Sequence, residues 1–408
     1  MGAAVAIAAS LCGLVAGTDL RLEADLKVAT GVRRLAYEGL PARTLGEIWA
    51  IPRLALEAEG RMTFRAAYDP RLFLPVDVSA GAPELRRAEV FSDRAEVLHR
   101  ADLLAELRLD PTLRAGLRAN GAYGRTDLLA GGIWTPELVP TTARIQYLFG
   151  EAVAFLAGDA TRRTSFSAEA GAFTTGGADE PSQAVLPLQR GLRVVSALAW
   201  DAARRDSLTL PLEATWSRFT PGGDAAFVRA GLRWRHLATR ALALRVGAGA
   251  AGTYSQSPGI ESIRRAAPWA EVGASHAPEN ARPTWDLATT LEPVIDRLSG
   301  TIDLRLGLEA SLTWRPSRRW AFEGRGAAAA LQPWIAAEAR SDLDTRVFAL
   351  DLRTARRVGG HATVGVVLWG RAQRTTRPSL ASFIEWGGFL EVTGFSRSQG
   401  APRPSRAR

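Results

Sequence analysis

The chain has 408 residues, of which 47% are hydrophobic and 23% charged, and its formal net charge is +9. That length could hold two or three ordinary domains, but no linker-like change of composition divides it, which favours one closed structure. Almost all of the positive charge is arginine, since Lys27 is the only lysine. The basic residues are spread along the chain instead of gathering with aromatic residues into a patch, which argues against a nucleic-acid partner.

Residues 1–17 have several features of a signal peptide. An apolar run fills residues 3–16, and residues 15–17 are small enough for a signal peptidase site. No Lys or Arg precedes Arg21, so the usual positive segment is missing and an earlier start codon stays open. The single cysteine, Cys12, lies inside this segment. A secreted mature chain would therefore have no disulfide and no thiol chemistry.

The first predicted strands lie between residues 19 and 74. Residues 19–29 alternate apolar and polar side chains, as a half-buried strand does. Residues 46–59 and 61–74 are predicted to pair as a hairpin, because Gly60 suits a tight turn. The apolar residues on both sides of Gly60 share one parity, however, so a single long strand is the alternative.

Residues 97–110 and 113–124 form the next predicted hairpin, and from there short and long connections alternate. Short connections are predicted near residues 158–162, 201–206, 237–239, 277–281, 316–317 and 355–359, and longer loops at 125–141, 174–187, 220–224, 256–265, 333–340 and 371–382. Residues 97–394 contain fifteen predicted strands. The total is 18, or 16 if residues 46–74 are one strand and residues 19–29 lie outside the sheet.

The strand pattern is clearest in residues 301–314, where every even position is apolar. Most alternating segments have 11 to 16 residues, which suits a tilted strand crossing a bilayer, since about 9–11 are needed. No stretch approaches the roughly 20 apolar residues of a membrane-spanning helix. A soluble sandwich or solenoid is the alternative, but its strands would be shorter. We predict an all-β fold, a transmembrane antiparallel up-and-down β-barrel, because a sheet in lipid must close on itself.

Charged residues share the polar phase of these strands, with arginine in excess. The predicted lumen-lining residues are Arg100, Arg108, Arg114, Arg118, Arg229, Arg233, Arg245, Arg305, Arg325, Asp102, Glu106, Glu213, Asp303 and Glu309. Glu151 and Arg193 break the rule, because each falls in an apolar phase. A β-bulge, a strand end or a subunit contact would explain them.

The last predicted strand ends in a recognisable pattern. Glu385 is followed by Gly387 two residues on, and Leu390 and Val392 are the hydrophobic residues at the sixth and eighth positions. This pattern resembles the C-terminal assembly signal of Gram-negative outer-membrane β-barrel proteins. The resemblance covers roughly residues 19–395. It implies an outer-membrane location, with outer-membrane lipid and the barrel assembly machinery as partners.

The domain organisation expected from this resemblance is a signal peptide at residues 1–17, a barrel at 18–395 and a tail at 396–408. Many members of the class end on the final strand, so the tail is a departure. Its Pro, Ser and Arg content predicts a disordered, basic periplasmic extension.

Three functions fit such a barrel. A barrel of 16 to 18 strands normally leaves an aqueous channel, so the first hypothesis is a porin-like channel for small hydrophilic solutes. The arginine excess would favour anions. The alternative is export of a polysaccharide together with a periplasmic or inner-membrane apparatus, and the third is a structural or adhesive barrel that displays its loops, the longest at residues 75–96. A homo-oligomer is a further option.

Enzymatic chemistry has little support in the sequence. The four histidines, His99, His236, His276 and His361, have no Ser or Asp at a telling spacing, and no two have metal-ligand spacing. No Gly-rich phosphate loop opens a helix. We expect no enzyme activity, no cofactor and no bound metal.

Overall fold

The computed structural model of the chain describes residues 19–38, 42–77, 96–126, 145–220, 222–256, 262–278, 283–296, 300–334, 344–377 and 382–397. The predicted signal peptide, most of the predicted loop at 75–96 and the tail beyond residue 397 lie outside these residues. Within the described part of the chain, no helix is long and apolar enough to cross a membrane.

The described residues are almost entirely β-strand, with one short helix, α2 (Glu180–Val185). The strands are β1 (Asp19–Tyr37), β2 (Arg43–Glu59), β3 (Met62–Tyr68), β4 (Arg71–Asp77), β5 (Glu96–Arg108), β6 (Leu113–Thr126), β7 (Ile145–Thr161), β8 (Thr164–Gly177), β9 (Leu188–Asp201), β10 (Asp206–Thr220), β11 (Asp224–Leu237), β12 (Leu242–Gln256), β13 (Ile263–His276), β14 (Thr284–Ile295), β15 (Ile302–Trp314), β16 (Trp320–Pro333), β17 (Thr345–Val358), β18 (Ala362–Thr375) and β19 (Phe383–Arg397).

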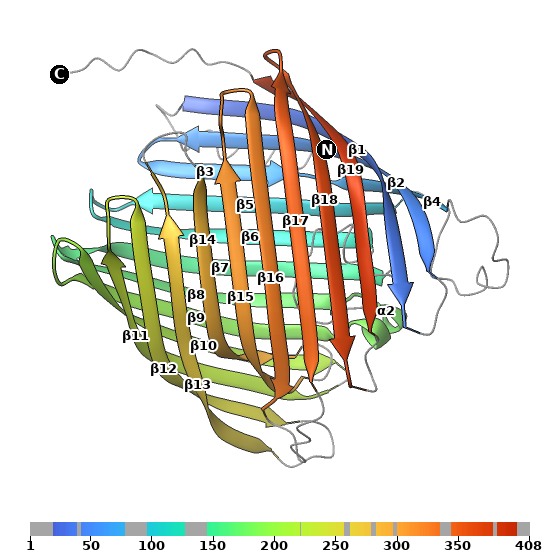
Figure 1. Ribbon diagram of the computed structural model, residues 1–408. Coiled ribbons are helices and arrows are strands. Elements are labelled where there is room, and N and C mark those ends of the chain that lie inside the picture. Colours follow the sequence, from blue (N-terminus) through green and yellow to red (C-terminus); the bar gives the residue numbers. More distant parts are fainter. Residues whose placement is uncertain are drawn as a thin grey trace, which may run out of the picture.

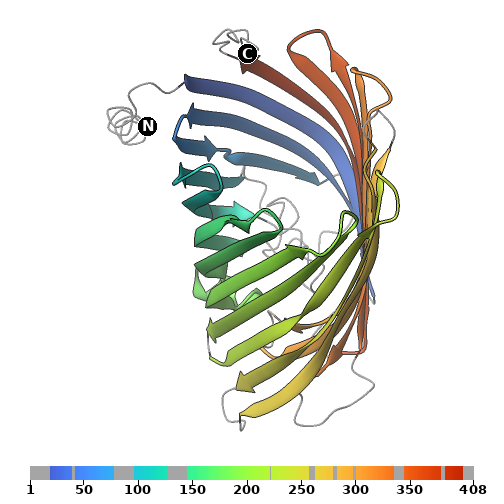
Figure 2. The same ribbon diagram turned by 90° about the vertical axis from the view of Figure 1, so that its left-hand side faces the viewer.

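The sheet closes into a barrel (Figures 1 and 2). Every pairing is antiparallel, and β1 pairs with β19 over a register that runs from Glu23↔Arg397 to Tyr37↔Phe383. β3 and β4 each pair with both β2 and β5, so together they fill one position in the wall. The barrel therefore has 18 wall positions. The predicted fold is confirmed, and the 16-strand alternative is wrong.

The predicted hairpin at Gly60 is confirmed, since β2 ends at Glu59 and β3 begins at Met62. The sequence did not show that its second arm is interrupted after Tyr68. Pro70 lies in the interruption, where a residue without an N–H cannot donate to a ladder. The backbone N–H of Asp69 still donates to the Arg100 carbonyl at 3.1 Å, which keeps the two halves on one line.

Several predicted boundaries are wrong; for example, β18 continues to Thr375 although a loop was predicted from residue 371. β1 continues to Tyr37 instead of ending at residue 29, because Arg33 turns inward and is buried between Glu47 and Glu385. β17 continues to Val358, and the turn follows at residues 359–361. Gly359 supplies the left-handed φ of 67° that this turn requires.

The outside of the barrel is apolar. Large side chains at one parity of each strand are exposed, for example Leu117 (62%), Leu192 (55%) and Ile384 (60%). Soluble proteins rarely expose a continuous belt of this kind. In a bilayer such a face lies in hydrocarbon, so the exterior is built for a membrane.

Candidate functional site: the inner face of the barrel

All fourteen predicted lumen-lining residues lie on the strand face opposite the exposed apolar side chains. On β6, for example, Leu117 is exposed outside while Arg114 and Arg118 occupy the other parity. In a closed barrel that other face is the inner one. Whether each residue lines a conducting path stays a prediction.

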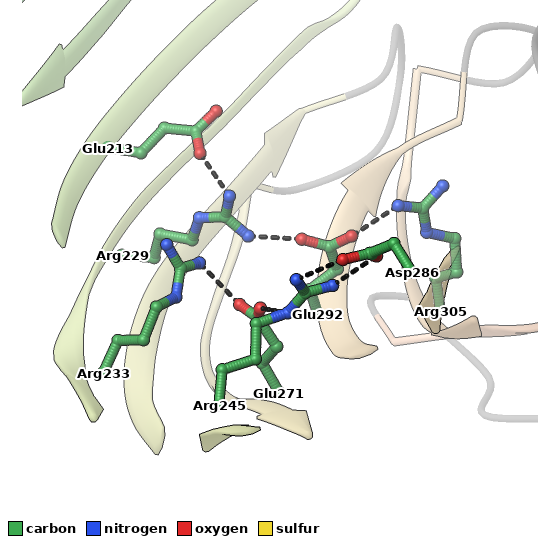
Figure 3. A network of polar contacts seen from close by, with 8 residues as sticks. All are labelled: Glu213, Arg229, Arg233, Arg245, Glu271, Asp286, Glu292 and Arg305. Atoms are coloured by element: carbon green, nitrogen blue, oxygen red, sulfur yellow. Dashed lines mark hydrogen bonds and ion pairs between the residues drawn. The ribbon is translucent and has the colours of Figure 1, made fainter. Parts of the chain in front are cut away.

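Eight charged residues on β10 to β15 form two ion-paired groups of four, here together called the inner network (Figure 3). Its members are Glu213, Arg229, Arg233, Arg245, Glu271, Asp286, Glu292 and Arg305. Arg229 is central to the group that Glu213, Glu292 and Arg305 complete, because it pairs with Glu213 at 2.5 Å and also with Glu292. β12 and β13 lie between the strands of Arg229 and Glu292, so this pair spans the concave side of the sheet.

In the rest of the inner network, acidic and basic side chains also alternate from one contact to the next. Glu292 also binds Arg305 at 2.5 Å, and Arg245 bridges Glu271 at 3.0 Å and Asp286 at 2.7 Å. Arg233 binds Glu271 at 2.5 Å. Sequence reasoning missed Glu271, although its parity opposite Val272 was a usable signal.

The other predicted residues lie elsewhere on the inner face. Arg118 pairs with Glu169 at 2.7 Å across β7, and Arg114 lies 3.8 Å from Glu106. Arg325 stands opposite Asp351 in the β16–β17 register. The remaining members of the predicted set that share this inner parity outside the inner network are Arg100, Asp102, Arg108 and Glu309.

The two apparent exceptions are also on the inner face. Glu151 lies opposite Asn120 in the β6–β7 register, at the parity away from the exposed Leu156. Arg193 pairs with Glu213 at 2.9 Å. They looked misplaced because the inner face itself carries apolar residues such as Phe155.

Inner aromatic rings are seated over glycines on neighbouring strands. A Cβ at Gly231 would lie 2.5 Å from the Trp269 ring, and one at Gly247 would lie 2.9 Å from it. The guanidinium groups of Arg229 and Arg233 each lie 5.9 Å from the centre of the same ring. Trp269 is therefore covered on both sides and only 5% exposed.

One hairpin bends into the barrel. β13 pairs with β14 only from Ala270↔Leu291 to His276↔Trp285, and beyond Leu291 the end of β14 turns away (Figure 1). The inward hairpin, residues 292–296 and 300–304, places Ile302 against Phe219, an inner-face residue of β10.

An apolar cluster holds this inward hairpin against the wall. Its fully buried members are Phe219, Ala225, Ile295 and Ile302, and Phe227, Ile263 and Trp334 pack against them. Ser255, on the inner face of β12, donates to the Gly300 carbonyl at 3.3 Å. Side chains that would face lipid on a straight strand are thus buried inside.

A buried arginine holds the other side of the inward hairpin. The Arg377 guanidinium, just after β18, binds Asp303 at 2.8 Å and Asp296 at 3.2 Å. β16 and β17 separate β18 from β15 in the wall, so Arg377 reaches inward past them. Asp303 is fully buried by this contact and so contributes to the hairpin's anchor.

A second connection at the same end also folds over inner residues. α2 is capped by the Asp179 carboxylate, which accepts the Ser182 N–H at 2.9 Å, and this hydrogen bonding lowers the pKa of Asp179. The neighbouring Leu186 packs on Leu98 and Tyr147, both of inner parity. The loop end of the barrel is therefore narrowed from two sides.

Histidines do not gather on the inner face. His99 shares a 2.7 Å hydrogen bond with the Tyr68 hydroxyl, and His236 contacts Asp206 at 2.8 Å. His99, His236 and His276 have outer parity, and His361 lies in the turn before β18. Among the described residues, no group of three His, Cys, Asp or Glu side chains could hold a metal ion.

Comparison with known proteins gives one family match. A family model described as the EpsX exopolysaccharide export family matches residues 138–339, just under half of the chain. That span includes all of the strands from β7 to β16, with a few residues on either side, and it contains the whole inner network. No curated protein sequence matches the chain significantly.

Solved structures share the fold at low sequence identity. OccK9 (OpdG) from Pseudomonas aeruginosa is 12% identical with a TM-score of 0.50, over 93% of this chain and 99% of that one. The FrpB iron transporter from Neisseria meningitidis (F3-3 variant) is 9% identical with a TM-score of 0.50, over 92% of this chain and 82% of that one. With its closed 18-position barrel and apolar exterior, the chain is an outer-membrane β-barrel protein, as the sequence predicted.

Proposed function

We propose that the chain is the outer-membrane conduit of a polysaccharide export system. The observation that carries this proposal is the match of the EpsX exopolysaccharide export model to residues 138–339. The matched span includes the inner network and the inward hairpin, so the likeness covers part of the inner surface that a polymer would touch.

The chemistry of the inner wall supports passage of a polymer. Most of its arginines are held by carboxylates, as Arg229 is by Glu213 and Glu292. A paired charge binds a passing group more weakly than an isolated one, and conduction requires binding that is weak enough to release. The wall offers many polar contacts without one dominant trap.

Deletion of the gene, with complementation, tests export directly. We expect the deletion strain to lose surface polysaccharide, measured by dye binding and by sugar analysis of washed cells, and the complemented strain to regain it. A heat-modifiable band in outer-membrane fractions controls for the folded barrel. Wild-type surface polysaccharide in the deletion strain would refute the proposal.

A porin-like channel for small hydrophilic solutes is the second candidate. The fold likeness to OccK9, over nearly the whole of both chains, favours it. Conductance of the purified barrel in a planar bilayer with a salt gradient separates the two. A steady open channel together with unchanged surface polysaccharide in the deletion strain would favour the porin.

A further inference from the structure

We infer that the inner wall carries a binding subsite for an anionic sugar unit, on the side of the barrel away from the inner network. This inference rests on the proposed function and names the chemistry of its substrate. The subsite is a cavity of about 500 Å³ between β1, β2 and β16 to β19. Its size suits one or two sugar rings.

An aromatic platform forms the floor of the cavity. The Trp49 and Phe389 ring centres lie 5.3 Å apart, and those of Trp369 and Phe389 lie 6.5 Å apart. All three rings are only half-buried. Pyranose rings present C–H groups on one face, and that face can pack on an aromatic surface. Most other polar molecules have no such apolar face.

Glycines fix the platform in place. A Cβ at Gly31 would collide with the Phe389 ring, and one at Gly387 would lie 2.9 Å from the Trp369 ring. The Trp49 indole N–H donates to Glu47 at 3.2 Å, which fixes the third ring. A platform held rigid before binding loses little entropy when a sugar arrives.

Charged side chains surround the platform, and an excess of basic ones favours an anionic ligand. Glu391 binds Lys27 and Arg353, each at 2.5 Å, and Arg353 also lies 3.8 Å from Glu323. Six basic side chains line the cavity against four acidic ones. The Arg353 side chain is 40% exposed, so its planar fork can still reach a ligand carboxylate.

The opposite wall provides the contrast. There the inner aromatic Trp269 is 5% exposed, because Arg229 and Arg233 cover its open face. The three rings at the cavity are each half-buried, so each offers more of its surface to the interior than Trp269 does. The cavity thus brings three half-buried rings together, whereas the ring of Trp269 is covered.

Calorimetric titration of the purified full chain in detergent tests the subsite, with hexagalacturonate as the anionic probe and maltohexaose as the neutral one. We expect hexagalacturonate to bind at least tenfold more tightly. W369L should weaken both probes, whereas R353Q should weaken hexagalacturonate alone. W386L is the matched control, because Trp386 lies opposite Gly370 on the neighbouring strand β19 and faces outward, 54% exposed. Both probes should bind W386L as they bind the wild type.

Several outcomes would overturn the subsite. They are no binding to the wild-type chain at millimolar probe, equal affinity for both probes, or wild-type affinity in folded W369L and R353Q. The R353Q arm keeps the test decisive if W369L fails to fold. A chain that binds no probe but is required for export would refute the subsite and leave the proposed function standing. A chain that binds hexagalacturonate while its deletion leaves surface polysaccharide unchanged would refute export instead.

Discussion

Single glycines on the inner face determine where the aromatic rings lie. A Cβ at Gly231 would come within 2.5 Å of both the Trp269 ring and the Ala248 carbonyl. Backbone cannot move far in a ladder paired on both sides, so G231A should lower the free energy of unfolding by about 1–3 kcal/mol, the usual cost of overpacking. Urea unfolding in lipid vesicles, followed by tryptophan fluorescence, measures the loss.

Gly252 is the control for that substitution. It lies on the neighbouring strand β12, and a Cβ there would meet nothing within 4 Å. Because Ala restricts the unfolded chain more than Gly does, G252A should be neutral or slightly stabilising. Equal effects of G231A and G252A would show that the glycine–tryptophan contact is unimportant.

Arg229 joins the two carboxylates of its group in the inner network. Its side chain is 25% exposed and neutralises both Glu213 and Glu292. R229Q would leave two largely buried carboxylates with fewer partners, so we expect a loss of about 1–3 kcal/mol in the free energy of unfolding. R218Q is the control, because Arg218 pairs with Asp224 at the rim with 66% exposure, where such a pair contributes about 0–1 kcal/mol. A loss no larger in R229Q than in R218Q would contradict the assignment.

At the scale of elements, the inward hairpin governs how open the loop end is. Arg377 is its polar anchor, bound to Asp296 and Asp303. Removing one partner of a buried ion pair costs about 3–5 kcal/mol. R377A should therefore release the hairpin and raise the single-channel conductance of the purified barrel in a planar bilayer. R346A, which breaks the exposed pair with Asp344, should leave conductance unchanged. An unchanged conductance in R377A would mean that the apolar cluster alone holds the hairpin.

Element positions were predictable where lipid imposes a strict period of two. The fifteen strands from β5 to β19 follow from that period together with the turn and loop residues between them, and the hairpin at Gly60 follows from its turn residue. The inward hairpin could not be predicted, because Ile295 and Ile302 continue the apolar parity of straight strands. Packing against Phe219 removes these two side chains from water as lipid would. The same apolar alternation is therefore compatible with a straight strand in the wall and with a hairpin bent inward.

The inner face was predictable for charge and less so for contacts. Parity alone places Arg229 and Arg245 inside, but the partner of Arg229 on β14 depends on the curvature of the barrel. The platform of Trp49, Trp369 and Phe389 was missed, because aromatic residues of inner parity look like lipid-facing ones. Their neighbouring glycines were the available signal.

For the whole molecule, the formal net charge is +9, and the arginines of the inner face are the part of that charge that an ion inside the barrel would meet. The double variant R114E/R118E lowers the net charge of the interior by four, because it removes two positive charges and adds two negative ones, on β6 and away from the inner network. The reversal potential under a salt gradient should move toward cation preference. The shift should shrink at 1 M salt, where the Debye length falls from about 10 Å at 0.1 M to about 3 Å.

A matched variant separates interior charge from total charge. Arg204 and Arg240 lie exposed in the short turns after β9 and β11, outside the wall. R204E/R240E changes the net charge by the same amount, yet the reversal potential should stay near the wild-type value, because a field at the rim is screened before it reaches the interior. If both double variants shift the potential equally, Arg114 and Arg118 are not in the conducting path. If neither shifts it, ions do not pass along β6.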